Sequence, residues 1–366
     1  MARQHPGQAP GANAGGVVVS VDAMGGDNGP DVVVAGLAHS AKKNPDIRFI
    51  LHGPEDELRQ LVAKRGHLAE RCDIRDAESV VTMDARPSQV VRQSAGSSMQ
   101  AAIESVRDGE ATVCVSCGNT GALMALAMIQ LKKLPGVARP AIAVLLPART
   151  GSEHMVMLDV GADVRAEARD LLQFALMGAS YARNGLGIET PQLGLLNVGT
   201  EHHKGRSELR DADEMIAAAA AESGFSYAGF VEGSDIMSDR ADVIVTDGFT
   251  GNVAIKTAEG TAGLIRASLS EAFRYTPLSR IAALLAYPSL RRLAKRIDPR
   301  RRNGGVFLGL NGTVVKSHGS ADATGVSAAV KLACRLAATG FSERLAARVA
   351  STAPTEDQRA HDGTGG

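Results

Sequence analysis

Short runs of Val, Ile and Leu alternate with longer segments rich in Ala, Leu, Glu and Arg from residue 17 to about residue 352. This alternation predicts βαβ units, and therefore a mostly parallel sheet with helices on both faces. No Pro- or Ser-rich linker divides this segment, so we expect one α/β domain over residues 17–352. The predicted strands are Val17–Val21, Ile47–Leu51, Ala111–Ser116, Ala141–Leu146, Met155–Asp159, Leu193–Asn197, Asp242–Thr246 and Thr313–Lys316. The predicted helices are Asp31–Lys42, Ser97–Arg107, Thr120–Leu131, Arg165–Tyr181, Glu208–Glu222, Gly251–Ala272 and Ala321–Ala338.

Four of the predicted strands end in a polar turn that contains glycine. These turns are Asp22–Asp27, Ser116–Gly121, Asn197–Glu201 and Thr246–Asn252. A strand that opens through such a turn into a helix points free backbone N–H groups at an anion. Because ligands of open α/β sheets bind at the carboxyl ends of the strands, the pattern predicts one shared anion-binding crevice.

An amphipathic basic segment interrupts this pattern in the last third of the chain. Apolar residues recur there mostly every three to four positions, at Leu278, Ile281, Leu284, Leu285, Leu290, Leu293 and Ile297. Seven basic residues and one acidic residue lie between Arg291 and Arg302, and Pro288 predicts a break between two short helices. Such a segment lies on an anionic membrane, holds an acidic protein, or packs on its own core with a solvated basic face.

Composition limits the partners and the location. The charges balance at 40 basic and 40 acidic residues, Trp is absent, and there are only 4 Tyr and 8 Phe, so we expect no nucleic-acid partner. No apolar run reaches the roughly 18 residues of a membrane-spanning helix. Residues 1–16 lack the apolar core of a signal peptide; we expect them and residues 353–366 to be disordered extensions, and the protein to be cytoplasmic.

Several standard cofactor and catalytic patterns are missing. The chain has no G-x-G-x-x-G, no phosphate loop of the NTPase kind and no G-x-S-x-G elbow, and the scattered histidines predict no metal site. Cys114 and Cys117 form a C-x-x-C. Without a second such pair to complete a zinc site, they are better explained as small buried residues than as a redox pair or metal ligands.

Six longer motifs make a family resemblance specific. In order along the chain they are Val21–Asp27, Cys117–Met124, Leu158–Asp163, Leu195–Glu201, Val245–Asn252 and Lys316–Asp322. Together they closely resemble the bacterial acyl-ACP:phosphate acyltransferase (PlsX) family, from about Val17 to Ala338. The resemblance implies a Rossmann-like α/β/α sandwich related to isopropylmalate dehydrogenases and phosphotransacetylases, with a protruding helical pair at about 274–302.

The resemblance also implies an activity and partners. Members move a long fatty acyl group from acyl carrier protein to inorganic phosphate, and the acyl phosphate feeds a membrane-bound glycerol-3-phosphate acyltransferase in phospholipid synthesis. No cofactor is implied. Members are homodimers that associate peripherally with the membrane. The residues of this chain expected to contact an anionic membrane are Leu284, Leu285, Leu290, Arg291, Arg292, Leu293 and Lys295.

The expected chemistry is direct attack of phosphate on the thioester, which needs a held dianion and donors for the oxyanion. The catalytic candidates are His318 and Lys256 as donors, oriented by Asp247 and Asn252. For Asp247, capping of the following helix is a competing role. The phosphate- or substrate-binding candidates are Asp22, Gly25, Gly26, Asp27, Gly118, Asn119, Thr120, Gly121, Asn197, Gly199, Thr200, Lys204, Gly248, Thr250, Gly251, Gly319 and Ser320; Arg206 is a further anion contact, and Cys117 replaces a small residue of the family pattern.

Two other functions fit parts of the same sequence pattern. A hydroxy-acid dehydrogenase of a related fold would use NAD and usually a divalent metal held by clustered Asp residues, whereas Asp22, Asp159 and Asp247 are far apart in the sequence. A non-catalytic scaffold would use Leu278–Arg302 to recruit lipid-synthesis proteins. Turnover of nicotinamide would favour the dehydrogenase. An absence of phosphate-dependent release of the carrier thiol would favour the scaffold.

Overall fold

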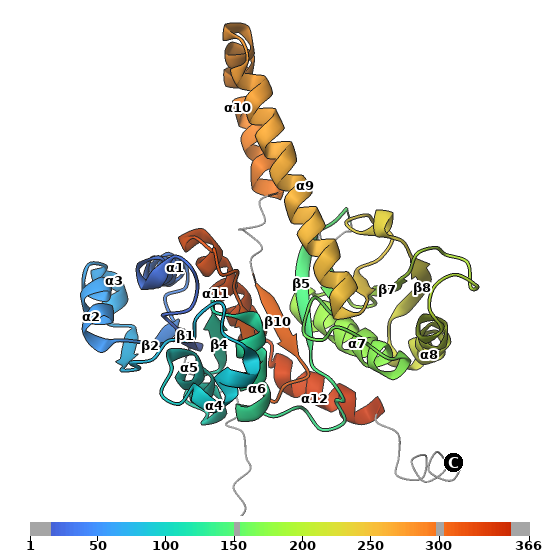
Figure 1. The fold of residues 1–366 in the computed structure, drawn as a ribbon, viewed down its shortest axis with the longest axis horizontal. Helices are drawn as coiled ribbons and strands as arrows, with labels where there is room; N and C mark the ends of the chain where they lie inside the picture. Colours follow the sequence, from blue (N-terminus) through green and yellow to red (C-terminus); the bar gives the residue numbers. More distant parts are fainter. Residues whose placement is uncertain (1–15, 150–153, 298–303, 353–366) are drawn as a thin grey trace, which may run out of the picture. The chain divides into compact units, whose positions relative to one another are not determined.

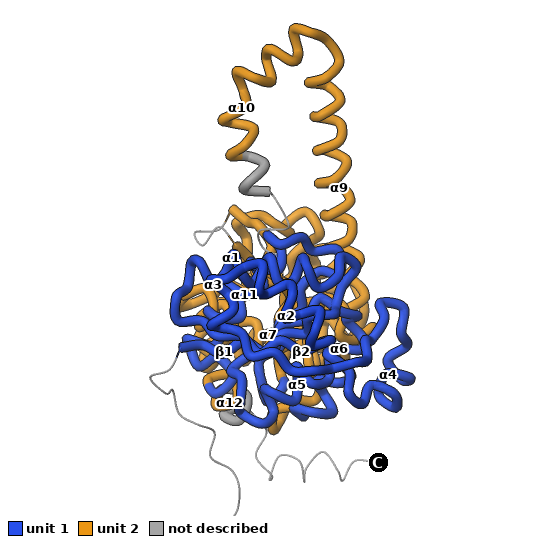
Figure 2. The backbone as a smooth tube through the Cα atoms, turned by 90° about the vertical axis from the view of Figure 1, so that its left-hand side faces the viewer, with its two compact units in different colours: residues 1–132, 310–343 blue, residues 133–309, 344–366 orange. Residues whose placement is uncertain are grey.

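The computed structural model describes residues 16–149, 154–297 and 304–352. The predicted terminal extensions, apart from Gly16, and Arg300 to Arg302 therefore lie outside the described residues. The chain folds into two compact units (Figures 1 and 2). Unit 1 comprises residues 1–132 and 310–343, and unit 2 comprises residues 133–309 and 344–366.

Unit 1 contains a parallel sheet in the strand order β3-β2-β1-β4-β11. Its strands are β1 (Val18–Asp22), β2 (Arg48–His52), β3 (Cys72–Arg75), β4 (Val113–Ser116) and β11 (Thr313–Lys316). Every residue of β4 and β11 is buried, as expected for apolar strands of a parallel sheet that is covered on both faces. The carboxyl ends of β1, β4 and β11 therefore share one edge.

Helices cover both faces of this sheet (Figure 1). The helix α11 (Ala323–Ala338) packs on α1 (Gly29–Lys43), and α5 (Ser98–Arg107) packs on α6 (Thr120–Gln130). The shorter helices are α2 (Glu55–Ala63), α3 (Gly66–Ala69) and α4 (Pro87–Gln93). The residues of the last helix, α12 (Phe341–Thr352), are divided between the two units.

Unit 2 contains a mixed sheet in the order β10-β5-β6-β9-β7-β8. The strands are β5 (Ala141–Pro147), β6 (His154–Leu158), β7 (Gln192–Leu196), β8 (Ser226–Val231), β9 (Val243–Val245) and β10 (Gly305–Leu308). β5 runs antiparallel to β10 and β6, whereas β6, β9, β7 and β8 are parallel. The helices α7 (Ala168–Tyr181) and α8 (Ser207–Ser223) pack on each other.

A long antiparallel pair of helices, α9 (Gly248–Arg274) and α10 (Pro277–Ile297), belongs to unit 2. Figures 1 and 2 show the two helices side by side, joined at Tyr275 and Thr276. Only Gly248, Gly251 and Ile255 of α9 are buried. α9 therefore packs on unit 2 through its first turns and continues as the first limb of the helical pair.

The prediction for this segment is wrong in one respect. Pro288 lies inside α10, which continues through it, although Pro removes a hydrogen bond and usually breaks or kinks a helix. The predicted arm at about 274–302 contains the second limb, and the first limb is the helix predicted at Gly251–Ala272. Among the described residues, no helix is long and apolar enough to cross a bilayer.

Candidate functional site

Two of the four predicted polar turns, those after β1 and β4, meet the turn after β11 at the carboxyl edge of the sheet in unit 1, whereas the other two turns belong to unit 2. The Asp27 N–H donates to the Gly319 carbonyl at 2.8 Å, which links the turn after β1 to the turn after β11. A Cβ on Gly25 would lie 2.6 Å from the Gly118 nitrogen, so only glycine permits this approach to the turn after β4. The structure thus brings together the predicted residues Asp22 to Asp27, Gly118 to Gly121 and His318 to Ser320.

Asp22 is the buried anchor of these turns. Its carboxylate accepts hydrogen bonds from the hydroxyls of Ser98 and Ser116, both at 2.7 Å, and Ser116 Oγ also accepts the Gly118 N–H at 3.0 Å. Burial raises the pKa of Asp22, and the serine and backbone donors at Met24 and Gly25 oppose that rise. Asp22 therefore holds the turns in shape and is itself shielded from solvent.

Asn119 is the N-cap of α6. Its Oδ1 accepts the Ala122 N–H at 2.9 Å, and its Nδ2 donates to the carbonyls of Met83 and Ala85. The next two residues, Thr120 and Gly121, are exposed. The first N–H groups of a helix have no partner inside the helix, so this end of α6 presents donors that suit an anion.

His318 and Lys316 differ in their surroundings. His318 is exposed, and its Nδ1 lies 3.3 Å from Ser320 Oγ. Lys316 is buried at the end of β11, where its ammonium donates to the carbonyls of Ser317 and Cys117. Lys316 thus ties two of the turns together, while the side chain of His318 is exposed on this edge.

Cys117 is buried in the turn after β4. Burial raises the pKa of its thiol, although a hydrogen bond from Ser317 and the charge of Lys316 oppose the rise. Burial also raises the pKa of Cys114. Both cysteines are free, and a shielded thiol with a raised pKa is a poor nucleophile.

In unit 2, the start of α9 packs against the loop after β6. Asp159, at the beginning of this loop, is fully buried and accepts N–H groups from Ile142, Ala162 and Asp163 at 2.9–3.1 Å. Burial nevertheless raises its pKa. A Cβ on Gly251 would lie 2.0 Å from the Asp159 carbonyl oxygen, so glycine is required where α9 meets the loop.

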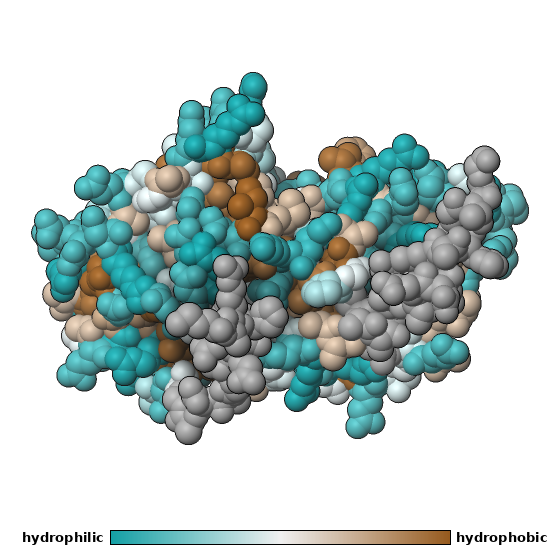
Figure 3. Space-filling view, turned by 90° about the horizontal axis from the view of Figure 1, so that it is seen from below, coloured by the Kyte–Doolittle hydropathy of each residue, from teal (hydrophilic) through white to brown (hydrophobic). Residues whose placement is uncertain are grey.

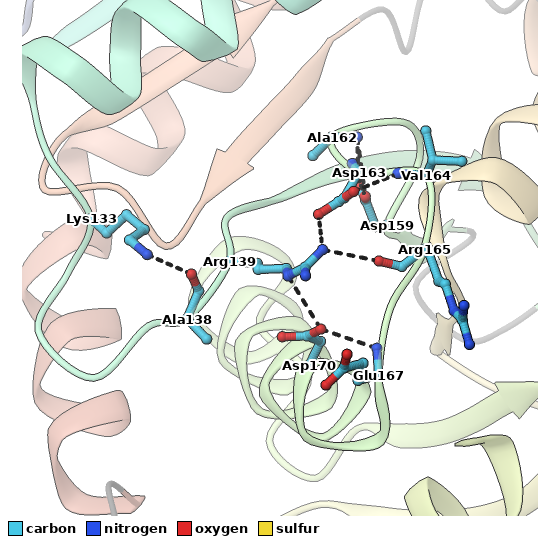
Figure 4. A network of polar contacts seen from close by, with 10 residues as sticks. All are labelled: Lys133, Ala138, Arg139, Asp159, Ala162, Asp163, Val164, Arg165, Glu167 and Asp170. Atoms are coloured by element: carbon cyan, nitrogen blue, oxygen red, sulfur yellow. Dashed lines mark hydrogen bonds and ion pairs between the residues drawn. The ribbon is translucent and has the colours of Figure 1, made fainter. Parts of the chain in front are cut away.

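An arginine network fixes the rest of this loop (Figure 4). Arg139 pairs with Asp163, donates to the Arg165 carbonyl at 3.2 Å, and lies 3.4 Å from Asp170. Asp170 also accepts the Glu167 N–H in the capping box of α7. The network therefore joins the loop after β6 to the start of α7.

The predicted residues Asp247 and Asn197 lie at the ends of β9 and β7. Asp247 is the N-cap of α9: one carboxylate oxygen accepts the Thr250 N–H at 2.8 Å and the other pairs with Arg206. Burial raises the pKa of Asp247, but the hydrogen bonds from Thr250 and Arg206 outweigh it and leave the pKa below its ordinary value. Asn197 is buried and donates to the Lys204 carbonyl at 3.2 Å.

The other candidates of unit 2 are more exposed or more local. Lys204 pairs with Glu201, and Lys256 pairs with Glu259, both at 2.8 Å and both on exposed surface. Thr200 and Asn252 are exposed; Gly199, Gly248 and Gly251 are buried. Most of these residues lie in the turns after β7 and β9, whereas Lys256 lies further along α9. Their catalytic or binding roles stay predictions.

Most of the residues predicted to contact a membrane are exposed where they are described. Leu284 and Leu285 are 75% and 79% exposed, Arg291 and Arg292 are exposed, and Leu290 is partly buried. The side chains of Leu293 and Lys295 lie outside the described residues. By contrast, on the face in Figure 3, outside the grey atoms, hydrophobic residues form separate patches among hydrophilic ones, as is usual for water-exposed surface.

Two solved structures share the fold of this chain. A phosphotransacetylase from Streptococcus pyogenes superposes with a TM-score of 0.59, at 18% identity, covering 88% of this chain and 94% of its own. The EutD phosphotransacetylase from Staphylococcus aureus gives a TM-score of 0.58 at 13% identity, with the same coverage. These confirm the predicted Rossmann-like α/β/α sandwich and its similarity to the phosphotransacetylase fold; identities this low establish the fold alone.

The family follows from closer relatives. A profile described as "Fatty acid synthesis protein" matches residues 17–344. A phosphate acyltransferase from Paracoccus denitrificans is 67% identical over 351 residues, which cover 96% of this chain and 95% of the relative. One from Dinoroseobacter shibae is 69% identical, over 92% of this chain and 87% of the relative. The chain therefore belongs to the phosphate acyltransferase family and is an enzyme of the acyltransferase class. This confirms the predicted resemblance.

Three features of the site were missed in the sequence. These are Lys316, the two serines that hold Asp22, and Arg139. Lys316 is the last residue of a predicted strand and the first residue of a family motif, and this position could have identified it as a site residue. Ser98 lies 76 residues from Asp22, so no local pattern indicates their contact.

Proposed function

We propose that this enzyme transfers a long-chain acyl group from acyl carrier protein to inorganic phosphate and releases an acyl phosphate for phospholipid synthesis. The observation that carries the proposal lies at the carboxyl edge of the sheet in unit 1. The N-terminus of α6 is exposed there at Thr120 and Gly121, next to the turn that Asp22 holds and the turn that contains His318. A family of phosphate acyltransferases needs a site for a phosphate dianion, and this edge supplies backbone donors for one. The relatives' name supports phosphate as the acceptor.

In the proposed mechanism, phosphate is the nucleophile. The N–H groups at the start of α6 hold the dianion, and one of its oxygens attacks the thioester carbonyl. The C–S bond breaks as the tetrahedral intermediate collapses, and the carrier thiol leaves as a thiolate. A thiol of ordinary pKa, about 8.5, needs little acid assistance, so no acyl-enzyme is required.

Protein donors stabilise the negative charge that develops on the carbonyl oxygen. His318 is the donor that we assign to this oxygen in unit 1, because it is exposed beside the phosphate-binding turns. The orienting and donor roles predicted for Asp247, Asn252 and Lys256, at or after the N-cap of α9, are a separate proposal for unit 2. Asp22 acts through the turns that it holds.

In the decisive test, acyl carrier protein that carries a fatty acyl thioester is incubated with the enzyme, with and without phosphate. Free thiol and acyl phosphate are then measured together. We expect both products in equal amounts, and only with phosphate. Thiol release without acyl phosphate would instead indicate hydrolysis. No release at all would favour the scaffold, and nicotinamide reduction with a hydroxy acid would favour the dehydrogenase.

We further propose that α10 brings the enzyme to anionic membranes as a peripheral, cytoplasmic homodimer, next to the glycerol-3-phosphate acyltransferase that consumes its product. The exposed leucines of α10 and the basic residues after them support this proposal. A helix with an exposed apolar face and flanking Arg and Lys binds anionic lipid in two ways: the apolar side chains are buried in the bilayer interface, and the basic side chains are attracted to the anionic headgroups. Light scattering of the purified enzyme tests the dimer.

The membrane test uses a double variant, Leu284→Ser with Leu285→Ser. Burial of one leucine stabilises by about 2 kcal/mol, so the pair should lower vesicle partitioning by about 100- to 1000-fold. The matched control is Met128→Ser with Ile129→Ser, which removes two exposed apolar side chains from α6. Equal sedimentation of both double variants with anionic vesicles would contradict a membrane role for α10.

A further inference from the structure

Arg206 is held at the strand ends of unit 2 by a buried carboxylate. Its guanidinium pairs through Nη2 with Asp247 Oδ2, whose side chain is only 3% exposed. The Arg206 side chain itself is 50% exposed. One nitrogen of the guanidinium is therefore fixed on a buried carboxylate, while half of the Arg206 side chain stays exposed and the group has further N–H donors.

The surroundings of Arg206 make the charge rigid as well as accessible. Arg206 is the N-cap residue of α8, and Asn197 holds the preceding loop through Lys204. Asp247, its partner, also caps α9 through Thr250. The ends of two helices thus fix both members of the pair, which limits the side-chain entropy that Arg206 would lose on binding an anion.

The two lysine candidates of unit 2 pair with more exposed carboxylates. Lys204 and Lys256 each pair with a glutamate three residues away. Both partners are at least one-third exposed, and exposed pairs of this kind hold a side chain weakly. Among the carboxylates of these three ion pairs, Asp247 is the buried one.

We propose that Arg206 binds a phosphoryl group of a substrate and that Asp247 positions it. This inference rests on the proposed function, in which two phosphoryl groups are present: the inorganic phosphate and the phosphodiester of the carrier arm. A planar guanidinium donates two parallel hydrogen bonds to either group. The exposed side chains of Val198 and Phe249, on the two turns involved, provide apolar surface suited to a fatty acyl thioester.

Steady-state kinetics of Arg206→Ala tests the proposal. Loss of a charge-assisted contact should raise KM by about 10- to 100-fold. A rise in KM for phosphate identifies the inorganic ion, and a rise in KM for acyl-carrier protein identifies the phosphodiester. The matched control, Arg210→Ala, removes an exposed arginine one turn further along α8 and should change neither KM.

Three further measurements separate binding from folding. Free guanidinium ion should partly restore the activity of Arg206→Ala, and Arg206→Lys should show a smaller rise in KM than the alanine variant. Asp247→Asn keeps an N-cap residue but loses the charge that orients Arg206. We expect it to raise the same KM as Arg206→Ala, with normal thermal unfolding.

Calorimetric titration with inorganic phosphate and with carrier protein makes the test independent of turnover. Active wild-type enzyme with unchanged KM values in Arg206→Ala would overturn this inference and leave the proposed function standing. Wild-type enzyme that binds either ligand through Arg206 but releases no thiol would overturn the proposed reaction alone. The inference is also overturned if wild type and Arg206→Ala bind each ligand equally well, or if neither protein binds either ligand.

Discussion

Acid should destabilise this protein through one buried histidine, His52. Its side chain lies in unit 1 at the end of β2, where Nε2 is 3.1 Å from the hydroxyls of both Ser20 and Ser105. Its Nδ1 has no hydrogen-bond partner among the described residues. Burial lowers the pKa of His52 to about 4, with a further contribution from the charge of Arg75.

The size and sign of the effect follow from this pKa. The folded chain takes up the proton less readily than the unfolded chain, whose histidine titrates near 6.5. Stability is therefore complete above pH 6.5 and is lost as the pH falls toward 4. The total loss is about 3 kcal/mol, of which about 2 kcal/mol occurs between pH 7.5 and pH 5.

The assay compares the free energy of unfolding at pH 7.5 and pH 5 for wild type and His52→Gln. The difference between the two pH values should be about 2 kcal/mol smaller in the variant. His39→Gln, at an exposed histidine of α1, is the control and should preserve the wild-type difference. NMR titration of wild-type His52 gives a second readout; a midpoint near 6.5 would refute the reasoning.

Three more substitutions test the packing of the turns. Gly251→Ala should destabilise by about 2 kcal/mol or more because its Cβ has no room, whereas Gly260→Ala, in open space on α9, should stabilise by about 0.5–1 kcal/mol in urea unfolding; similar values for the two would contradict the close approach. Ser98→Ala should cost about 1–3 kcal/mol of stability, since it removes a donor from buried Asp22, and an unchanged melting curve would count against that role. Cys117→Ala should keep most activity in the thiol-release assay, and a loss of several orders of magnitude would show that its buried thiol takes part in the reaction.

Much of the fold could be predicted because apolar runs mark buried strands directly. β1 and β11 begin and end within one residue of their predictions, Val17–Val21 and Thr313–Lys316. Three of the described strands were missed. β3 and β8, at the two ends of the strand order, are only partly buried and carry polar residues, and the buried β10 is a run of only four residues that begins with glycine. The antiparallel direction of β5 was also missed, because an apolar strand has the same pattern in either direction.

Local patterns of side chains were enough to indicate the alternation of strands and helices, the polar turns at the strand ends and the family motifs, because each of these lies within a short stretch of chain. Which charges are buried, which are paired and which face solvent emerged only in the folded chain. Asp247 and Arg206 are 41 residues apart, and Asp22 and Ser116 are 94 apart. Such partners meet because the order of strands in each sheet places their ends together, and that order depends on packing across the whole unit.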